Sequence, residues 1–117
     1  MTVTVKQICT PGYSKRVRNV PQSEKVAVFK EYGITPSGNY EIDHLISLEL
    51  GGSNDAKNLW PESYLTKRYN AHTKDKLENR LHWLVCHASL PIPAAQQAIS
   101  GDWIASYEHF VVQNATK

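Results

Sequence analysis

The sequence predicts a single α+β domain that is mainly helical and contains one short pair of strands. Two short apolar segments, residues 40–45 and 58–60, flank a glycine turn and predict the strands. Two longer segments, at about residues 73–88 and 94–112, carry apolar residues at helical spacing. The length of 117 residues fits one domain, and a hydrophobic content of 41% is sufficient for a core of modest size.

The first part of the chain, residues 1–20, predicts an extended arm with a turn at Pro11-Gly12. A helix is predicted from Glu24 to Tyr32, because Ser23 is a good N-cap and Gly33 is a suitable C-terminal stop. Its apolar residues predict one face that packs on the core: Val26, Val28, Phe29 and Tyr32.

The strand pair is predicted from alternating and apolar residues between turn signals. A first strand from Tyr40 to Leu45 follows the turn residues Gly38-Asn39. After a turn at Gly51-Gly52, the segment Asn58-Leu59-Trp60 predicts a short second strand. We expect Pro61 to end that strand, because proline has no N–H to donate to a ladder.

Two helices are predicted in the second half of the chain. From about Thr73 to Ala88, four apolar residues recur at helical spacing and predict a core-facing stripe: Leu77, Leu81, Leu84 and Val85. Prolines in residues 90–93 then break the chain. Five residues repeat every fourth position and predict one long covering helix over about residues 94–112: Ala95, Ile99, Trp103, Tyr107 and Val111. Gly101 would be tolerated on its polar side at a cost of ~1 kcal/mol.

Four polar residues around the predicted strands are suited to phosphodiester chemistry. Asp43-His44 ends the first apolar run, Asn58 follows after thirteen residues, and His72 follows after thirteen more. A neutral imidazole with an ordinary pKa of ~6.5 is a good general base at neutral pH, which makes His44 the candidate. Carboxylate oxygen suits a hard divalent ion, and imidazole suits softer ions as well.

This constellation, with Gly51-Gly52 between its parts, resembles the HNH nuclease motif over roughly residues 40–80. The resemblance implies a ββα-metal hairpin-helix unit, with a motif core at about residues 40–88, within the domain. It implies a metal-dependent endonuclease that hydrolyses phosphodiester bonds of nucleic acid, with His44 as general base. Asp43 and His72 would hold one divalent ion, with Asn58 as a further ligand or as the residue that fixes the loop. The expected ion is Mg²⁺, with Mn²⁺, Ni²⁺ and Zn²⁺ as alternatives. The wider segment from Ile8 to Trp103 is also similar to small bacterial and phage HNH-like proteins.

The chain departs from the commonest HNH pattern at two points. It lacks the paired Cys-x-x-Cys knuckles that hold a structural zinc in many members. His72 also lies further from Asn58 than the last ligand of the family often does, so Asn58 or Asn70 are alternative third ligands. Adjacent strand residues point to opposite faces, so Asp43 and His44 share a site only at a strand end or a bulge. Glu41 or Glu49 would be available to orient an imidazole.

The charge distribution is compatible with a nucleic acid partner, DNA rather than RNA, without requiring one. The net charge is only +2, but basic residues form three clusters. Phosphate contacts are expected from two of them, Lys67-Arg68 and the group Lys74, Lys76 and Arg80; the third is Lys15-Arg16-Val17-Arg18. The alternative is that these residues only aid solubility. No apolar stretch approaches the ~20 residues of a membrane span, and no signal peptide is recognisable at the start.

Cys9 and Cys86 are the two cysteines, and they are too few for a zinc site by themselves. If they pair, the bond would tie the N-terminal arm to the helix after the motif and replace the missing zinc knuckle as a staple. A disulfide would indicate a secreted or periplasmic protein, whereas two buried thiols would suit a cytoplasmic one. His82, His87 and His109 are expected to be structural or solvated.

Two other classes of function compete with the nuclease. The first is a catalytically silent HNH-fold module that binds nucleic acid or a protein partner, such as a phage-encoded factor. The second is a secreted, disulfide-stapled binding domain, which rests on the cysteines alone. The convergence of Asp43, His44, Asn58 and His72 favours the enzyme, because a scaffold does not need these side chains in one cleft. The oligomeric state and any protein partner do not follow from the sequence.

Overall fold

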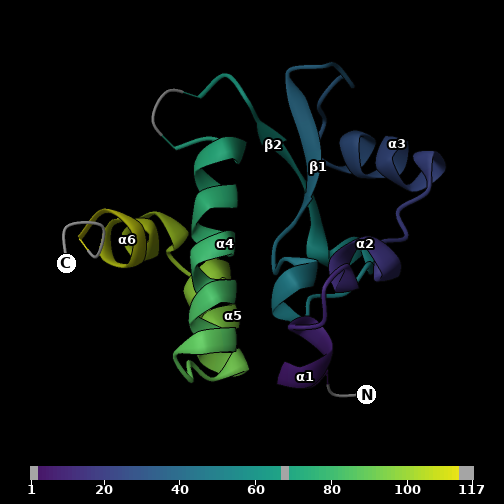
Figure 1. Ribbon diagram of the computed structural model, residues 1–117. Coiled ribbons are helices and arrows are strands. Elements are labelled where there is room, and N and C mark those ends of the chain that lie inside the picture. Colours follow the sequence, from purple (N-terminus) through teal and green to yellow (C-terminus); the bar gives the residue numbers. More distant parts are fainter. Residues whose placement is uncertain (1–2, 67–68, 114–117) are drawn as a thin grey trace.

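Helices dominate the architecture of the computed structural model, which describes residues 3–66 and 69–113 (Figure 1). The described part of the chain contains a two-stranded antiparallel sheet, so the expected α+β class is confirmed. In chain order the elements are α1 (Val5–Ile8), α2 (Tyr13–Val17), α3 (Gln22–Glu31), β1 (Tyr40–His44), η1 (Leu48–Leu50), η2 (Ala56–Asn58), β2 (Leu59–Ser63), α4 (Ala71–His87), α5 (Ile92–Ser100), α6 (Trp103–Tyr107) and the π-helical η3 (Glu108–Val112).

The sheet pairs β1 with β2 in a regular register that runs from Tyr40 opposite Ser63 to His44 opposite Leu59. The first strand is close to its predicted bounds, but the second runs further than expected. Pro61 does not end it and instead lies inside β2, opposite Ile42. A proline is tolerated there because both strands of a two-stranded sheet are edge strands.

The N-terminal arm is helical, which corrects the prediction of an extended segment. Thr4 starts α1 with a capping box, in which its hydroxyl accepts from the Gln7 N–H while the Gln7 side chain accepts from the Thr4 N–H. Gly12 precedes α2 with a positive φ of 81°. Helix α3 begins after Pro21 rather than after Ser23. Only part of its predicted core face is buried: Val28 and Phe29 are, whereas Val26 and Tyr32 are exposed.

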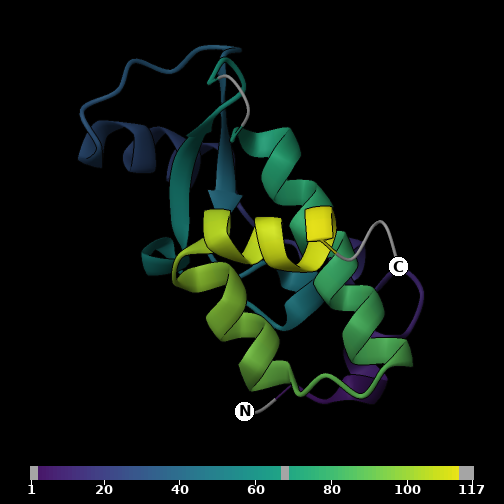
Figure 2. The same cartoon turned by 90° about the vertical axis from the view of Figure 1, so that its left-hand side faces the viewer.

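Helix α4 confirms the helix predicted after the strands, but it begins earlier, because the Asn70 side chain accepts from the backbone N–H groups of His72 and Thr73. The single long helix predicted over residues 94–112 is wrong. Helix α5 ends at Gly101, and Asp102 caps a new helix, α6, by accepting from the Ala105 N–H. In Figures 1 and 2, α6 runs across α4 instead of continuing α5. A local cap therefore overrides the period-four apolar pattern.

The main core lies where α4 and α5 meet η1 and α1. Its buried residues are Ile8, Leu50, Leu77, Leu81, Val85, Ala95 and Ile99. The turn after η1 approaches this core closely. A Cβ added to Gly52 would lie 1.8 Å from the carbonyl oxygen of Ile46, so only glycine fits there. The predicted glycine turn thus fixes the loop that joins β1 to β2.

A disulfide joins Cys9, at the end of α1, to Cys86 in α4, with an S–S distance of 2.01 Å. The predicted pairing is therefore confirmed. Replacing both cysteines by serine is expected to lower the free energy of unfolding by about 4 kcal/mol, because the bond closes a loop of 77 residues in the unfolded chain. Denaturant unfolding of wild type and the double variant measures this difference. Equal unfolding midpoints would contradict it.

Candidate functional site

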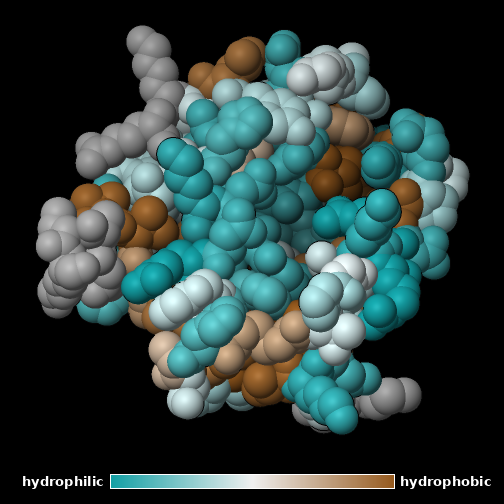
Figure 3. Space-filling view, viewed as in Figure 1, coloured by the Kyte–Doolittle hydropathy of each residue, from teal (hydrophilic) through white to brown (hydrophobic). Residues whose placement is uncertain are grey.

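The surface over α4 is mainly hydrophilic in the view of Figure 3. Largely buried polar side chains also come from α4 and from the two strands. We call this buried group the polar seam and define it by Asp43, His44, Glu62, Lys74 and Glu78. These residues come from both strands and from two turns of α4. All of them are buried except Asp43, which is partly exposed. Buried polar groups are costly unless they are paired, so their partners decide what the seam can do.

Lys74 forms the centre of the polar seam. Its side chain is completely buried, and its Nζ donates to Asp43 Oδ2 at 2.7 Å, to the His44 carbonyl oxygen at 2.8 Å and to Glu78 Oε1 at 2.8 Å. Burial lowers the pKa of Lys74, but the carboxylates of Glu78 and Asp43 outweigh that effect and the net pKa is raised. The ammonium therefore stays charged and holds β1 to α4.

The expectation that Lys74 contacts phosphates is therefore corrected. The sequence groups Lys74 with Lys76 and Arg80 as a basic cluster, but the 0% exposure of Lys74 leaves no surface for a nucleic acid. All three donors of the ammonium group already have acceptors within the protein. Lys74 acts instead as an internal cation for the carboxylates of the seam.

Glu62 adds a protonated carboxyl group to the seam. Burial, together with the hydrogen bond and negative charge of Asp43, raises the pKa of Glu62 to about 9. The side chain lies opposite Glu41 in the register, on the face of the sheet that also carries Asp43. Its Oε2 is buried and has no hydrogen-bond partner among the described residues. At neutral pH the seam thus contains an uncharged acid beside the ion pair of Lys74 and Asp43.

The raised pKa of Glu62 predicts a pH dependence of stability. Because the folded pKa of about 9 exceeds the ordinary glutamate pKa of 4.5, the folded state binds the extra proton between these values. The stability from this proton is complete below the unfolded pKa and is lost as pH rises through the folded pKa. Glu62→Gln, which stays neutral, is expected to melt above wild type at about pH 9 and to lose that advantage at about pH 5. Thermal unfolding measures this, with exposed Glu31→Gln as control, and a pH-independent difference would contradict it.

His44, the predicted general base, is the last residue of β1 and is 3% exposed. Its Nε2 lies 3.1 Å from Asn54 Oδ1, in the loop between the strands. Burial lowers the pKa of His44; the Asn54 hydrogen bond opposes this, and the positive charges of Arg18 and Lys74 add to it. The ring is therefore neutral at neutral pH, as a general base requires.

Asn54 determines which nitrogen of the His44 ring carries the hydrogen. Its Nδ2 donates to the Val17 carbonyl oxygen at 2.8 Å, and its Oδ1 accepts from the Asn19 N–H at 3.1 Å. These two bonds fix the orientation of the amide, so the atom that faces His44 is an acceptor. Nε2 must then carry the hydrogen, which leaves Nδ1 of the neutral ring as the basic atom.

Asp43 and His44 use different partners, as neighbouring residues in a regular strand should. The Asp43 carboxylate faces Lys74 of α4, whereas the His44 ring meets Asn54 of the loop. Their link is the Lys74 ammonium, which binds the Asp43 side chain and the His44 backbone.

Asn58 fixes the loop between the strands. Its Nδ2 donates to the carbonyl oxygens of Ile46 at 2.9 Å and Ser53 at 2.8 Å, and its Oδ1 accepts from the Ile46 N–H at 2.9 Å. Both donors of the amide are used, and the loop would lose these bonds if the side chain turned towards an ion. The sequence predicts that Asn58 is either a metal ligand or the residue that fixes the loop, and these contacts support the second role.

His72 lies in the first turn of α4 and is exposed. Its ring packs on Tyr64, with centroids 5.0 Å apart, and the Tyr64 hydroxyl donates to Glu41 Oε2 at 2.7 Å. Burial raises the pKa of the neighbouring Asp75, and the negative charges of Glu41 and Asp43 raise it further. The carboxyl groups of Glu41, Asp43 and Asp75 therefore interact with one another at the end of the seam next to His72. Asn70, the alternative third ligand, caps α4 instead.

Each of the predicted metal ligands has another partner within the protein. Asp43 is bound to Lys74, Asn58 is bound to the loop backbone, and His72 packs on Tyr64. Among the described residues, the one group of three His, Cys, Asp or Glu side chains placed closely enough to share an ion is Cys9, His82 and Cys86. The Mg²⁺ site expected from Asp43, His72 and Asn58 stays a prediction.

A polar pocket of about 180 Å³ opens beside the seam, between α2, η1 and α4. Its lining includes Arg18, Ser47, Glu49, Glu78 and Asn79. Arg18 is exposed, and its charge acts on His44. An arginine at the mouth of a small pocket is suited to bind a phosphate group. The sequence places Arg18 only in a basic cluster, and the structure adds its position beside this pocket, at the end of α2.

The other basic residues that were predicted to bind nucleic acid are placed differently. Lys76 is exposed on α4, and the Arg80 guanidinium lies over the Trp83 ring, 5.2 Å from its centroid. Lys67 and Arg68 lie outside the described residues.

Comparison of the chain with protein-family models, with curated proteins and with solved structures gave no match. No helix in the described part of the chain is long and apolar enough to cross a membrane.

Proposed function

We propose that the protein is an endonuclease in which β1, β2 and α4 form a ββα-metal unit and His44 is the general base. Phosphodiester bonds of nucleic acid, with DNA preferred over RNA, would be the substrate. The order hairpin then helix, with a histidine at the end of the first strand and an asparagine that fixes the intervening loop, supports this assignment.

One observation carries the proposal: the Asn54 amide orients a buried, neutral His44 imidazole. An imidazole used only for packing does not need a fixed tautomer, whereas a general base does. The bonds of Asn54 to Val17 and Asn19 supply that fixation from a segment 35 to 37 residues away. The lowered pKa of His44 keeps the ring unprotonated at neutral pH.

The residues of the chain suggest a simple sequence of steps. His44 Nδ1 takes a proton from a water molecule, and the resulting hydroxide attacks the phosphorus while the bond to the leaving oxygen breaks. The Arg18 guanidinium binds a phosphate oxygen at the pocket and offsets the negative charge that develops in the transition state. Solvent supplies the proton that the leaving oxygen takes.

The proposal includes a divalent ion, with Mg²⁺ expected first, and the metal requirement of cleavage is to be measured. Since Asp43, His72 and Asn58 have other partners in the structure, no step is assigned to a metal.

Plasmid cleavage by the purified full chain tests this function. The protein is incubated with supercoiled DNA and Mg²⁺, Mn²⁺, Ni²⁺, Zn²⁺ or EDTA, and nicked product is quantified. Nicking in any condition supports the nuclease, and the EDTA lane tells whether an ion is required. A folded protein that gives no nicking in any lane would contradict it.

A catalytically silent binding module is the second candidate, and a specific observation favours it. Lys74 neutralises the carboxylate that an ion would use, and His44 is only 3% exposed. Binding of a labelled duplex by a protein that never nicks it would identify this module.

The disulfide also bears on where the protein acts. Disulfides persist in oxidising compartments, so we propose a secreted or periplasmic location.

A further inference from the structure

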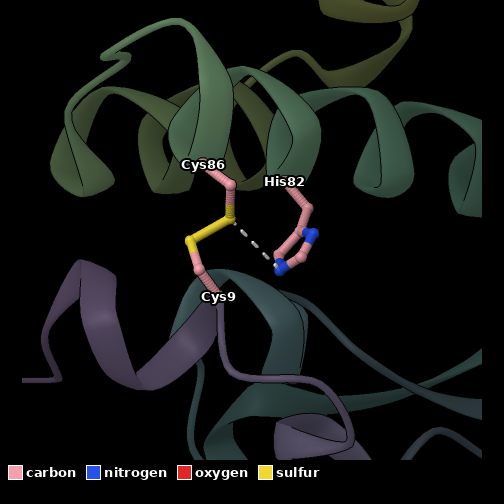
Figure 4. A group of neighbouring side chains, drawn as sticks. All are labelled: Cys9, His82 and Cys86. Carbon is pink, nitrogen blue, oxygen red and sulfur yellow. Dashed lines mark hydrogen bonds between the residues drawn. A yellow bond between two sulfur atoms is a disulfide. The ribbon is translucent and has the colours of Figure 1, made fainter.

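The disulfide has a histidine beside it. Cys9, His82 and Cys86 each offer a nitrogen or sulfur atom, and these ligand atoms all lie within 4.8 Å of one another. Figure 4 shows the His82 ring turned towards the two sulfur atoms, with Nε2 3.7 Å from Cys86 Sγ. His82 and Cys86 are four residues apart in α4 and so share a helix face, while Cys9 follows α1.

We propose that the protein, once its disulfide is reduced, binds one Zn²⁺ ion through the thiolates of Cys9 and Cys86 and the imidazole of His82. Zinc prefers thiolate and imidazole ligands in tetrahedral geometry, and this trio supplies three of the four positions. The fourth would be filled by water or by Glu49, a half-buried carboxylate of η1 that interacts electrostatically with His82. This inference does not depend on the proposed function.

Reduction of the disulfide must come before zinc binding. A dithiol reductant gives two electrons to the Cys9–Cys86 bond and becomes a disulfide itself, and each protein sulfur takes one proton. Zn²⁺ then displaces these two protons as it binds the thiolates. The His82 Nε2–H, which lies 2.9 Å from the Ile8 carbonyl oxygen, must give up that contact so that Nε2 binds the ion while Nδ1 carries the hydrogen.

The surrounding core keeps the three residues close when the disulfide is broken. Ile8, next to Cys9, is buried in the same hydrophobic cluster as Leu81 and Val85, which flank His82 and Cys86 in α4. Reduction removes a covalent bond but leaves this packing. Zinc would then restore the link between α1 and α4, so the same position holds the fold under oxidising and reducing conditions.

Cobalt titration of the reduced full chain tests the site, because Co²⁺ bound by thiolates shows an intense charge-transfer absorption. The protein is reduced with a dithiol, freed of reductant without oxygen, and titrated with Co²⁺ and then Zn²⁺. The expected result is a charge-transfer band that saturates at one Co²⁺ per chain and disappears when Zn²⁺ is added. The oxidised protein is expected to show no such band.

Single substitutions identify the ligands. Cys9→Ser and Cys86→Ser are expected to lose most of the band, and His82→Gln to weaken binding by about tenfold or more. His87→Gln, an exposed histidine on the same helix, is the matched control and should bind like wild type. Absence of the band from the reduced wild type, or unchanged affinity in His82→Gln, would overturn the proposal. If reduction unfolds the chain, a helical circular dichroism signal that returns with Zn²⁺ supports the site, and one that does not return overturns it.

Discussion

His44→Gln is expected to lower the single-turnover rate of plasmid cleavage by about 10²–10⁴-fold, the usual contribution of a positioned general base. Glutamine retains an N–H that can donate to Asn54 Oδ1, so the loop contact is kept. It has no nitrogen that can take a proton from water. The nicking assay under the condition of highest wild-type activity measures this loss.

The matched control is His87→Gln, which makes the same exchange at an exposed residue packed on Trp83. It should cleave like wild type. Circular dichroism and thermal unfolding establish that the His44 variant remains folded. Full activity in the folded His44→Gln protein would remove this residue from the mechanism.

Lys74→Met is expected to lower the free energy of unfolding by about 3–5 kcal/mol at neutral pH. Methionine has a similar length, but it leaves the Asp43 and Glu78 carboxylates, with side-chain exposures of 12% and 11%, without their cation. Denaturant unfolding measures the loss. Lys76→Met, at an exposed position of the same helix, is the control and should change stability little.

The loss in Lys74→Met should shrink as pH falls. Burial raises the pKa of Glu78 to about 8, so this side chain loses its negative charge as pH falls. The lysine then has less charge to balance, and the variant gains stability relative to wild type. A loss that is small, or that does not change with pH, would show that the ammonium is not the main partner of these carboxylates.

Helix α4 and strand β1 were predictable because their patterns are local. Leu77, Leu81 and Val85 recur at helical spacing and are all buried in the core. The disulfide was also predictable, because a chain with two cysteines allows only one intramolecular pairing.

The role of Lys74 was not predictable in this way. Its acceptors include Asp43 and the His44 carbonyl, which are 31 and 30 residues away along the chain. Its closeness in sequence to Lys76 and Arg80 therefore predicted phosphate contacts, whereas long-range pairing places the ammonium in the interior. Its one local signal was Glu78, four residues further on and on the same helix face.

Asn54 and the break at Gly101 were missed for related reasons. Asn54 has no distinctive local signal in the sequence, because its bonds to Val17, Asn19 and His44 depend on how α2 approaches the loop. At Gly101 the apolar residues keep their spacing of four on both sides of the break, so this pattern predicts one helix. The local signal for a second helix was Asp102, which caps α6. Tertiary contacts thus determine the role of Asn54, and a helix cap determines the break after α5.

The pH dependence of the single-turnover cleavage rate tests the central claim, that a neutral His44 imidazole is the base. The account predicts a rate that rises with pH and levels off with an apparent pKa below the ordinary histidine value of 6.5, because burial lowers the pKa of His44. A cleavage rate that does not change with pH would contradict the account. So would a pH profile with the same apparent pKa in the His44→Gln variant.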